Sequence, residues 1–186
     1  MITEAETNKI RDEVYRKIGR NILFIQGIEQ KLKNLIAING SRINSKSKTL
    51  DQRLADVSKK TMGNLAGEFY EVYFIDQNQK SQKGVEPIEP IYSFRLERNA
   101  FATHMRKSLA SIVEERNMLV HHFLQKLDVS KKSWEEADNR LEQQHKGLVA
   151  THESLNEFSS WLREIMLKDP SDISNKVSDK APEELS

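Results

Sequence analysis

The chain has 186 residues and no cysteine, and 37% of its residues are hydrophobic and 31% charged. This length suits one domain with a substantial core and is short for two complete domains. The absence of cysteine excludes disulfides, zinc–thiolate sites and cysteine nucleophiles. With only four prolines and seven glycines, long segments are unbroken, which favours helices.

The net charge of +1 does not by itself indicate a nucleic-acid-binding protein, but the charge is unevenly distributed. Residues 1–60 hold 13 basic and 7 acidic residues, whereas residues 169–186 hold 2 and 5. The polar, acidic N-terminus does not resemble a signal peptide. No apolar run approaches the roughly 20 residues that a membrane span needs. We therefore expect a cytoplasmic protein with no membrane segment, whose basic N-terminal third suits contact with phosphate.

Residues 6–38 are predicted to form one long helix that ends at Asn39-Gly40. Its apolar stripe recurs at helical spacings and comprises Ile18, Ile22, Ile25, Leu32 and Ile36. Glu29 falls on the same stripe, where a carboxylate is costly unless it is paired or reaches water. Either Ile28 faces the core and Glu29 lies at the edge of the stripe, or Glu29 points into a polar pocket and orients a basic group there.

A Ser/Asn-rich loop is expected over residues 39–48, and it carries Arg42, Lys46 and Lys48. This loop is either a solvated connector or a segment that holds a nucleic-acid backbone. Thr49 is placed to cap a helix that begins at Leu50, and the helical pattern continues to about residue 74 with a break near Gly63. Residues 75–93 are interpreted as a long loop without a clear strand.

Two further helices are predicted, over residues 94–127 and 131–168. The first has an apolar stripe of Phe101, Met105, Leu109, Ile112, Leu119 and Phe123. Ser130 or Ser133 is expected to cap the second. Its leucines recur every seven residues, a seam that packs along another helix within the chain or across a dimer: Leu141, Leu148, Leu155 and Leu162. We therefore predict an all-α protein, an antiparallel bundle of four to five long helices in one domain over residues 1–168, with a disordered acidic tail over 169–186.

The candidate site lies late in the predicted 94–127 helix. Arg116 falls on the apolar stripe, where a guanidinium needs partners, and Asn117 lies four residues before His121, so that these two share a face. On a regular helix Arg116 and His121 are about 140° apart around the axis. Two copies of the helix that face each other across a two-fold axis would place both pairs around one cleft.

This segment resembles the HEPN superfamily, whose signature is an arginine, often followed by a polar residue, and then a histidine after four to six intervening residues. Arg116, Asn117 and His121 match it, with four residues between arginine and histidine. Residues 17–21 and 29–33 are similar to first helices of some bacterial HEPN-like proteins. The resemblance covers about residues 6–168, although the 75–93 loop and the last helix are not diagnostic.

The resemblance implies a metal-independent endoribonuclease that acts as a homodimer, uses no cofactor and leaves 2′,3′-cyclic phosphate ends, in toxin–antitoxin or phage-defence biology with an antitoxin or regulatory partner. His121 would transfer the proton, Arg116 would hold the phosphate, and Asn117 would orient the imidazole. Glu29, if it faces inward, would pair with Arg116. His122 is expected to be a surface neighbour.

Other functions compete with this interpretation. Arg116 and His121 could be satisfied structural groups, and HEPN-like domains without catalysis serve as binding modules. A helical interaction protein would dimerise through the leucine seam, whereas an RNA-binding protein without catalysis would use Arg42, Lys46 and Lys48. No metal site is expected, because the five histidines show no His-x-x-x-His or His-Glu-x-x-His spacing. A phosphate-binding glycine loop and a nucleophile elbow are also missing from the sequence.

Overall fold

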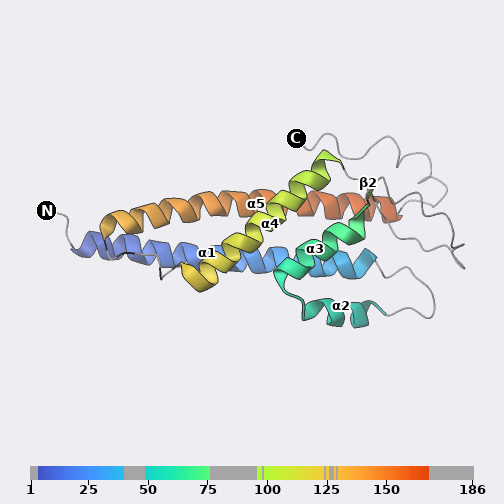
Figure 1. Ribbon diagram of the computed structural model, residues 1–186, viewed down its shortest axis with the longest axis horizontal. Coiled ribbons are helices and arrows are strands. Elements are labelled where there is room, and N and C mark those ends of the chain that lie inside the picture. Colours follow the sequence, from blue (N-terminus) through green and yellow to red (C-terminus); the bar gives the residue numbers. More distant parts are fainter. Residues whose placement is uncertain are drawn as a thin grey trace, which may run out of the picture. The chain divides into compact units, whose positions relative to one another are not determined.

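The computed structural model describes residues 4–39, 49–75, 96–97, 99–123, 125, 128 and 130–167. These residues form five α-helices (Figure 1), a π-helical turn and one short pair of strands. In chain order the elements are α1 (Glu4–Asn39), α2 (Leu50–Ser58), α3 (Met62–Tyr73), β1 (Phe74–Ile75), β2 (Leu96–Glu97), α4 (Ala100–Asn117), the π-helical turn η2 (Met118–His122) and α5 (Lys131–Leu167). The predicted all-α class is confirmed. No helix within the described ranges is long and apolar enough to cross a membrane.

Local side-chain caps explain where several helices begin. The Thr49 hydroxyl accepts a hydrogen bond from the backbone of Gln52, and the Gln52 side chain accepts one from the Thr49 backbone. This capping box confirms the predicted start of α2, because it satisfies donors that a helix N-terminus otherwise leaves free. The predicted Ser130 cap of α5 is also confirmed: its Oγ accepts from the Ser133 backbone at 3.3 Å.

The predicted helix break near Gly63 is confirmed: α2 ends at Ser58 and α3 begins at Met62, where the Thr61 side chain caps the new helix. Two predicted boundaries were wrong, each for a local reason. The helix predicted from residue 94 begins at Ala100, because Asn99 Oδ1 caps it by accepting from the Ala102 backbone at 2.9 Å. Phe74 and Ile75, which border the predicted 75–93 loop, pair in parallel with Leu96–Glu97. Residues 40–48 and 168–186, including the predicted basic loop and tail, lie outside the described residues, as do residues 76–95.

The chain divides into two compact units. One comprises Met1–Ile28 and Ser108–Glu153, and the other comprises Glu29–Lys107 and Ser154–Ser186. Each unit therefore holds part of α1, part of α4 and part of α5. In this order they are the first and the second unit.

In the first unit, the early parts of α1 and α5 pack side by side. Tyr15 contacts Trp134 edge to face with ring centroids 5.8 Å apart, and further along both helices Phe24 contacts His145 at 5.1 Å. Residue numbers rise together along the two helices, so α1 and α5 run parallel here and the predicted antiparallel arrangement does not describe this pair. Parallel neighbours need a long crossover, which the intervening segment through α4 provides.

The second unit is built around an aromatic cluster. Phe158 of α5 is 1% exposed and contacts four aromatic side chains from α3, β1 and α4, namely Phe69, Tyr73, Phe74 and Phe101. The Tyr73 hydroxyl donates a hydrogen bond to the backbone carbonyl of Leu35 at 2.7 Å. This satisfied polar end allows a tyrosine to be buried fully, and burial raises its pKa.

The leucine seam of α5 is buried within the chain. Its four leucines are each between 0% and 4% exposed. All six residues of the predicted α4 stripe are likewise buried. The heptad spacing allowed the seam to pack within the chain or across a dimer. Packing within the chain accounts for the burial of the seam.

Candidate functional site

The predicted site lies where α4 ends and the π-helical turn η2 follows. Arg116 is in the last turn of α4 and is half-buried, whereas Asn117, His121 and His122 are exposed. The apolar stripe passes from Ile112 to Leu119, and Arg116 lies at its edge. The expected burial of the guanidinium was therefore wrong, since its hydrogen bond lies in an exposed part of the surface.

The π-helical turn changes the angular relation between Arg116 and His121. In a π-helix each N–H bonds to the carbonyl five residues earlier, so that residues five apart approach the same face. Of the five residues that follow Arg116 up to His121, the last four belong to η2 (Met118–His122). The offset of about 140° that a regular α-helix gives to residues five apart is therefore reduced within one chain.

The polar side chains at this turn contact one another at the surface. Arg116 Nη1 donates to Asn117 Oδ1 at 3.2 Å, a contact that orients the guanidinium along the surface. The His121 and His122 rings lie 6.2 Å apart between centroids. The predicted roles of Asn117 and His121 in catalysis stay predictions.

Buried side chains on either side of these polar groups hold the turn in place. Leu119 and Phe123 are 7% and 6% exposed, and they anchor η2 and the residue that follows it. Val120 between them is 48% exposed. The turn therefore presents one apolar and two polar side chains to solvent, namely Val120, His121 and His122, while Leu119 is buried.

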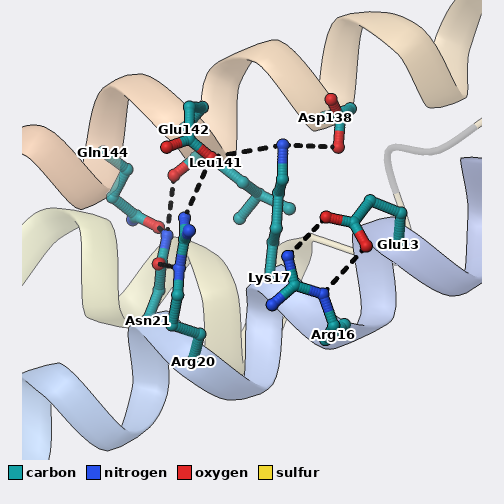
Figure 2. Close-up of polar contacts among 9 residues, drawn as sticks. All are labelled: Glu13, Arg16, Lys17, Arg20, Asn21, Asp138, Leu141, Glu142 and Gln144. Atoms are coloured by element: carbon teal, nitrogen blue, oxygen red, sulfur yellow. Dashed lines mark hydrogen bonds and ion pairs between the residues drawn. The ribbon is translucent and has the colours of Figure 1, made fainter.

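Hydrogen bonds from one side chain join α1 to α5 within the first unit. Gln144 Oε1 of α5 accepts from Asn21 Nδ2 of α1 at 2.8 Å, and Asn21 Nδ2 also donates to the Leu141 carbonyl at 2.9 Å. Figure 2 shows Asn21 pointing towards Gln144 and Leu141. Burial raises the pKa of Glu115, although Gln144, Arg140 and Ser111 favour its ionised form.

Further along the same helix pair, charged residues form a network. Lys17 Nζ lies 2.8 Å from Asp138 Oδ1 and 3.2 Å from Glu142 Oε2, and Arg20 lies 3.2 Å from the same Glu142 oxygen (Figure 2). The Lys17 side chain is 11% exposed. Burial opposes its charge, but the close carboxylates of Asp138 and Glu142 raise its pKa above the ordinary value.

Sequence reasoning missed this network, although the sequence carries a signal for it. Val14, Ile25 and Ile28 are buried on the inward face of α1, and so are Lys17 and Asn21 between them. Two polar residues at helical spacing within an apolar stripe indicate a buried polar layer. The stripe predicted through Ile18 and Ile22 lies one position away, and both isoleucines are only partly buried.

No described contact brings the other predicted site residues to η2. Ile28 is fully buried, and Glu29 lies at the edge of the stripe with Lys33 Nζ 2.7 Å from its Oε1, as the first of the two alternatives predicted. Glu29 belongs to the second unit and Arg116 to the first, and their pairing stays a prediction. Arg42, Lys46 and Lys48 lie outside the described residues.

The histidines do not form a recognisable metal centre. Over the part of the chain that the structure describes, no three histidine, aspartate or glutamate side chains come together as a potential ligand group. His145 contacts Phe24, and its Nδ1 is buried without a hydrogen-bond partner. Burial lowers the pKa of His145, with a contribution from the nearby Arg20 charge, so the neutral ring is the favoured form.

Comparison with protein-family models, with curated proteins and with solved structures finds no match to this chain.

Proposed function

We propose that the chain is a metal-independent endoribonuclease of the HEPN type, with Arg116, Asn117 and His121 at its active site and a homodimer as its working form. The observation that carries the proposal is the π-helical turn η2. It follows Asn117 directly and bears His121, so that the motif lies on an exposed turn with unusual helical geometry. Single π-helical turns inside α-helices occur frequently at functional sites.

The residue types suit transesterification of RNA. The ribose 2′-oxygen attacks the adjacent phosphorus, and the bond from phosphorus to the 5′-oxygen breaks, which leaves a 2′,3′-cyclic phosphate and a 5′-hydroxyl. An imidazole such as that of His121 accepts the 2′-hydroxyl proton or donates one to the departing oxygen. A guanidinium such as that of Arg116 binds two phosphate oxygens at once and stabilises the charge that develops on them.

A dimer would supply what one copy lacks. One chain offers a single catalytic imidazole in this motif, whereas proton removal and proton delivery occur at opposite sides of the phosphorus. Two copies that meet at η2 would bring two histidines and two arginines to one cleft. The exposed side chain of Val120, 48% accessible between the polar groups, would contribute apolar area to such a contact.

The dimer through the leucine seam is less well supported. Leu141, Leu148, Leu155 and Leu162 are already covered within one chain, so that a partner helix would have to displace α1 or another neighbour. Binding of RNA without cleavage is the remaining alternative, and the cleavage assay distinguishes it from catalysis.

The test is incubation of the purified protein with single-stranded RNA in excess EDTA. Arg116→Ala and His121→Ala are compared with His122→Ala, an exposed histidine next to the site that serves as the matched control. We expect cleavage to fall by about 10²-fold or more in the first two variants and to persist in the third. The same RNA with 2′-deoxyriboses should remain intact, since it lacks the nucleophile.

Two results would overturn the proposal. If the wild type binds RNA in a salt-dependent manner but leaves it intact, the chain is a binding protein. If cleavage persists equally in all three variants, the activity comes from a contaminant and the motif has no catalytic role. Circular dichroism and size-exclusion chromatography of each variant establish that fold and oligomeric state are retained.

A further inference from the structure

His145 of α5 contacts α1 through its ring, but the contact leaves one of its polar atoms unsatisfied. The imidazole meets the ring of Phe24 at 87°, with the ring centroids 5.1 Å apart. Its Nδ1 atom is buried and has no hydrogen-bond partner among the described residues. Buried polar atoms in proteins are nearly always hydrogen-bonded, so this nitrogen is an exception that calls for an explanation.

The contact between Phe24 and His145 belongs to a regular series along the parallel helices α1 and α5. Seven residues earlier on each helix, Lys17 Nζ lies 2.8 Å from Asp138 Oδ1. A step of seven residues is close to two full turns and returns to nearly the same face of a helix. The series therefore places an imidazole where the previous heptad holds the acceptor of an ion pair, and a phenyl ring opposite it where that heptad holds an ammonium group.

The neighbours of His145 suit an uncharged ring. Leu141 and Leu148, four residues before it and three residues after it, are 1% and 0% exposed. Phe24 also contacts the ring of His152, two turns further along α5, with centroids 5.6 Å apart. A neutral imidazole whose proton is on Nε2 has only an acceptor at Nδ1. Its burial therefore costs one unmade hydrogen bond and no charge.

Protonation of His145 would change this balance. The imidazolium carries an N–H on both nitrogens, so Nδ1 would become a buried donor without an acceptor, which costs more than the loss of an ordinary hydrogen bond gains. The positive charge would also be less well hydrated than in the unfolded chain. Both effects oppose the charged form in the folded protein.

The charged groups around His145 do not reverse this preference. Arg20, one turn before Phe24 on α1, and Glu142, one turn before His145 on α5, lie 3.2 Å apart and pair with each other (Figure 2). The Arg20 charge opposes protonation of His145 and the Glu142 charge favours it. Burial is the largest cause, and it lowers the pKa of His145 below its ordinary value of 6.5. The remaining titratable group at this level is His152, beyond the Phe24 ring.

We propose that His145 makes the packing of α1 against α5 sensitive to pH: the neutral ring holds the helices together at Phe24, and its protonation weakens this contact. The inference does not depend on the nuclease function proposed above. The unfolded chain takes up a proton on this histidine near pH 6.5, whereas the folded chain takes it up at lower pH. Stability is therefore full above pH 6.5 and falls as pH drops through that value, until the folded form is protonated too. Each unit between the two pKa values raises the unfolding equilibrium constant about tenfold.

Urea denaturation between about pH 7.5 and 5 tests the proposal. His145→Phe keeps an aromatic ring against Phe24 but cannot be protonated, and His145→Gln is a second variant that does not titrate, in case phenylalanine does not fit. We expect the wild type to lose stability relative to both variants as pH falls through 6.5. The matched control is His122→Gln, which removes an exposed histidine of the same unit and should follow the wild type. Loss of the carboxylate network falls at lower pH, because the pKa of Glu142 is lowered.

An NMR titration of the histidine rings measures the same effect in the folded protein. The signal that is missing in His145→Gln identifies His145, and its midpoint should lie below 6.5. Phe24→Leu opens the contact to water and should move this midpoint towards 6.5. Leu23→Ala is the control on the same helix, because Leu23 is 69% exposed, and it should leave the midpoint unchanged.

Two results would overturn the inference. A midpoint of His145 at or above 6.5 would show that the Phe24 ring or Glu142 stabilises the imidazolium, so that protonation strengthens the contact. Parallel loss of stability in the wild type, His145→Phe and His145→Gln between pH 7.5 and 5 would show that other groups determine the response to pH. Neither result bears on RNA cleavage, so this inference and the nuclease proposal fail independently.

Discussion

Replacing Lys17 with methionine should destabilise the protein by about 1–3 kcal/mol. The Lys17 side chain is 11% exposed, and its Nζ lies 2.8 Å from Asp138 and 3.2 Å from Glu142. Removing one partner of a fully buried ion pair costs about 3–5 kcal/mol, whereas an exposed pair contributes about 0–1 kcal/mol. The two carboxylates are 28% and 39% exposed, so water screens them and the expected cost lies between those limits. Methionine keeps most of the aliphatic volume, which limits the effect of a cavity.

The loss of Lys17 leaves Asp138 and Glu142 four residues apart on one face of α5. Like charges at this spacing repel each other. Asp138→Asn should therefore cost less stability in the Lys17→Met background than in the wild type, and this difference is the coupling energy of a double-mutant cycle. Urea denaturation followed by circular dichroism provides the free energies. Lys132→Met is the control, because the Lys132 side chain is 85% exposed and its Nζ lies 3.8 Å from Glu136 Oε1, a longer and more exposed ion pair.

The same substitution should change the acid sensitivity of the protein. The hydrogen bond from Lys17 is the largest cause that lowers the pKa of Glu142 below 4.5, and Arg20 adds to it. A carboxyl whose pKa is lower in the folded state stabilises the protein above its ordinary pKa, and this contribution is lost as pH falls through the lowered value. Lys17→Met should therefore lose less stability than the wild type between neutral pH and acid. Equal costs for Lys17→Met and Lys132→Met, or no coupling with Asp138, would refute the reasoning.

Two further substitutions test local features of the helices. Thr49→Ala removes the hydroxyl that accepts from the Gln52 backbone and should destabilise α2 by about 1 kcal/mol, seen as faster amide exchange in its first turn; unchanged exchange would mean that the cap contributes nothing. Gly27→Ala should stabilise the protein by about 0.5–1 kcal/mol, because Gly27 lies within α1 and an added Cβ would meet no atom within 4 Å. A lower urea midpoint for Gly27→Ala would show that this surface needs the glycine.

Most helix positions could be predicted from the sequence because their signals are local. Apolar residues at helical spacing marked α1, α4 and α5, and Thr49 and Ser130 marked two starts that the structure confirms. These signals depend on a few neighbouring residues. The start of α4 was missed because the capping residue Asn99 follows a stretch whose pattern continues that of the helix.

Local sequence signals could not predict which way α1 and α5 run relative to each other, or the polar network between them. The pairing of Lys17 with Asp138 and of Asn21 with Gln144 joins residues more than 120 positions apart. Periodicity shows which face of a helix is inward but not which helix it meets, or whether the two run parallel. In the α1 sequence, the buried polar residues Lys17 and Asn21 only interrupt the apolar pattern. The sequence does not indicate which residues of another helix they contact.

The candidate site illustrates the same limit at shorter range. The spacing of Arg116 and His121 was read from the sequence on the geometry of a regular α-helix, which sets them far apart around the axis. A π-helical turn has no reliable composition signal. The apolar stripe predicted that Leu119 and Phe123 face the core, and they are 7% and 6% exposed. The same stripe is compatible with a regular helix and with a π-helical turn, so the position of His121 relative to Arg116 around the axis could not be predicted from it.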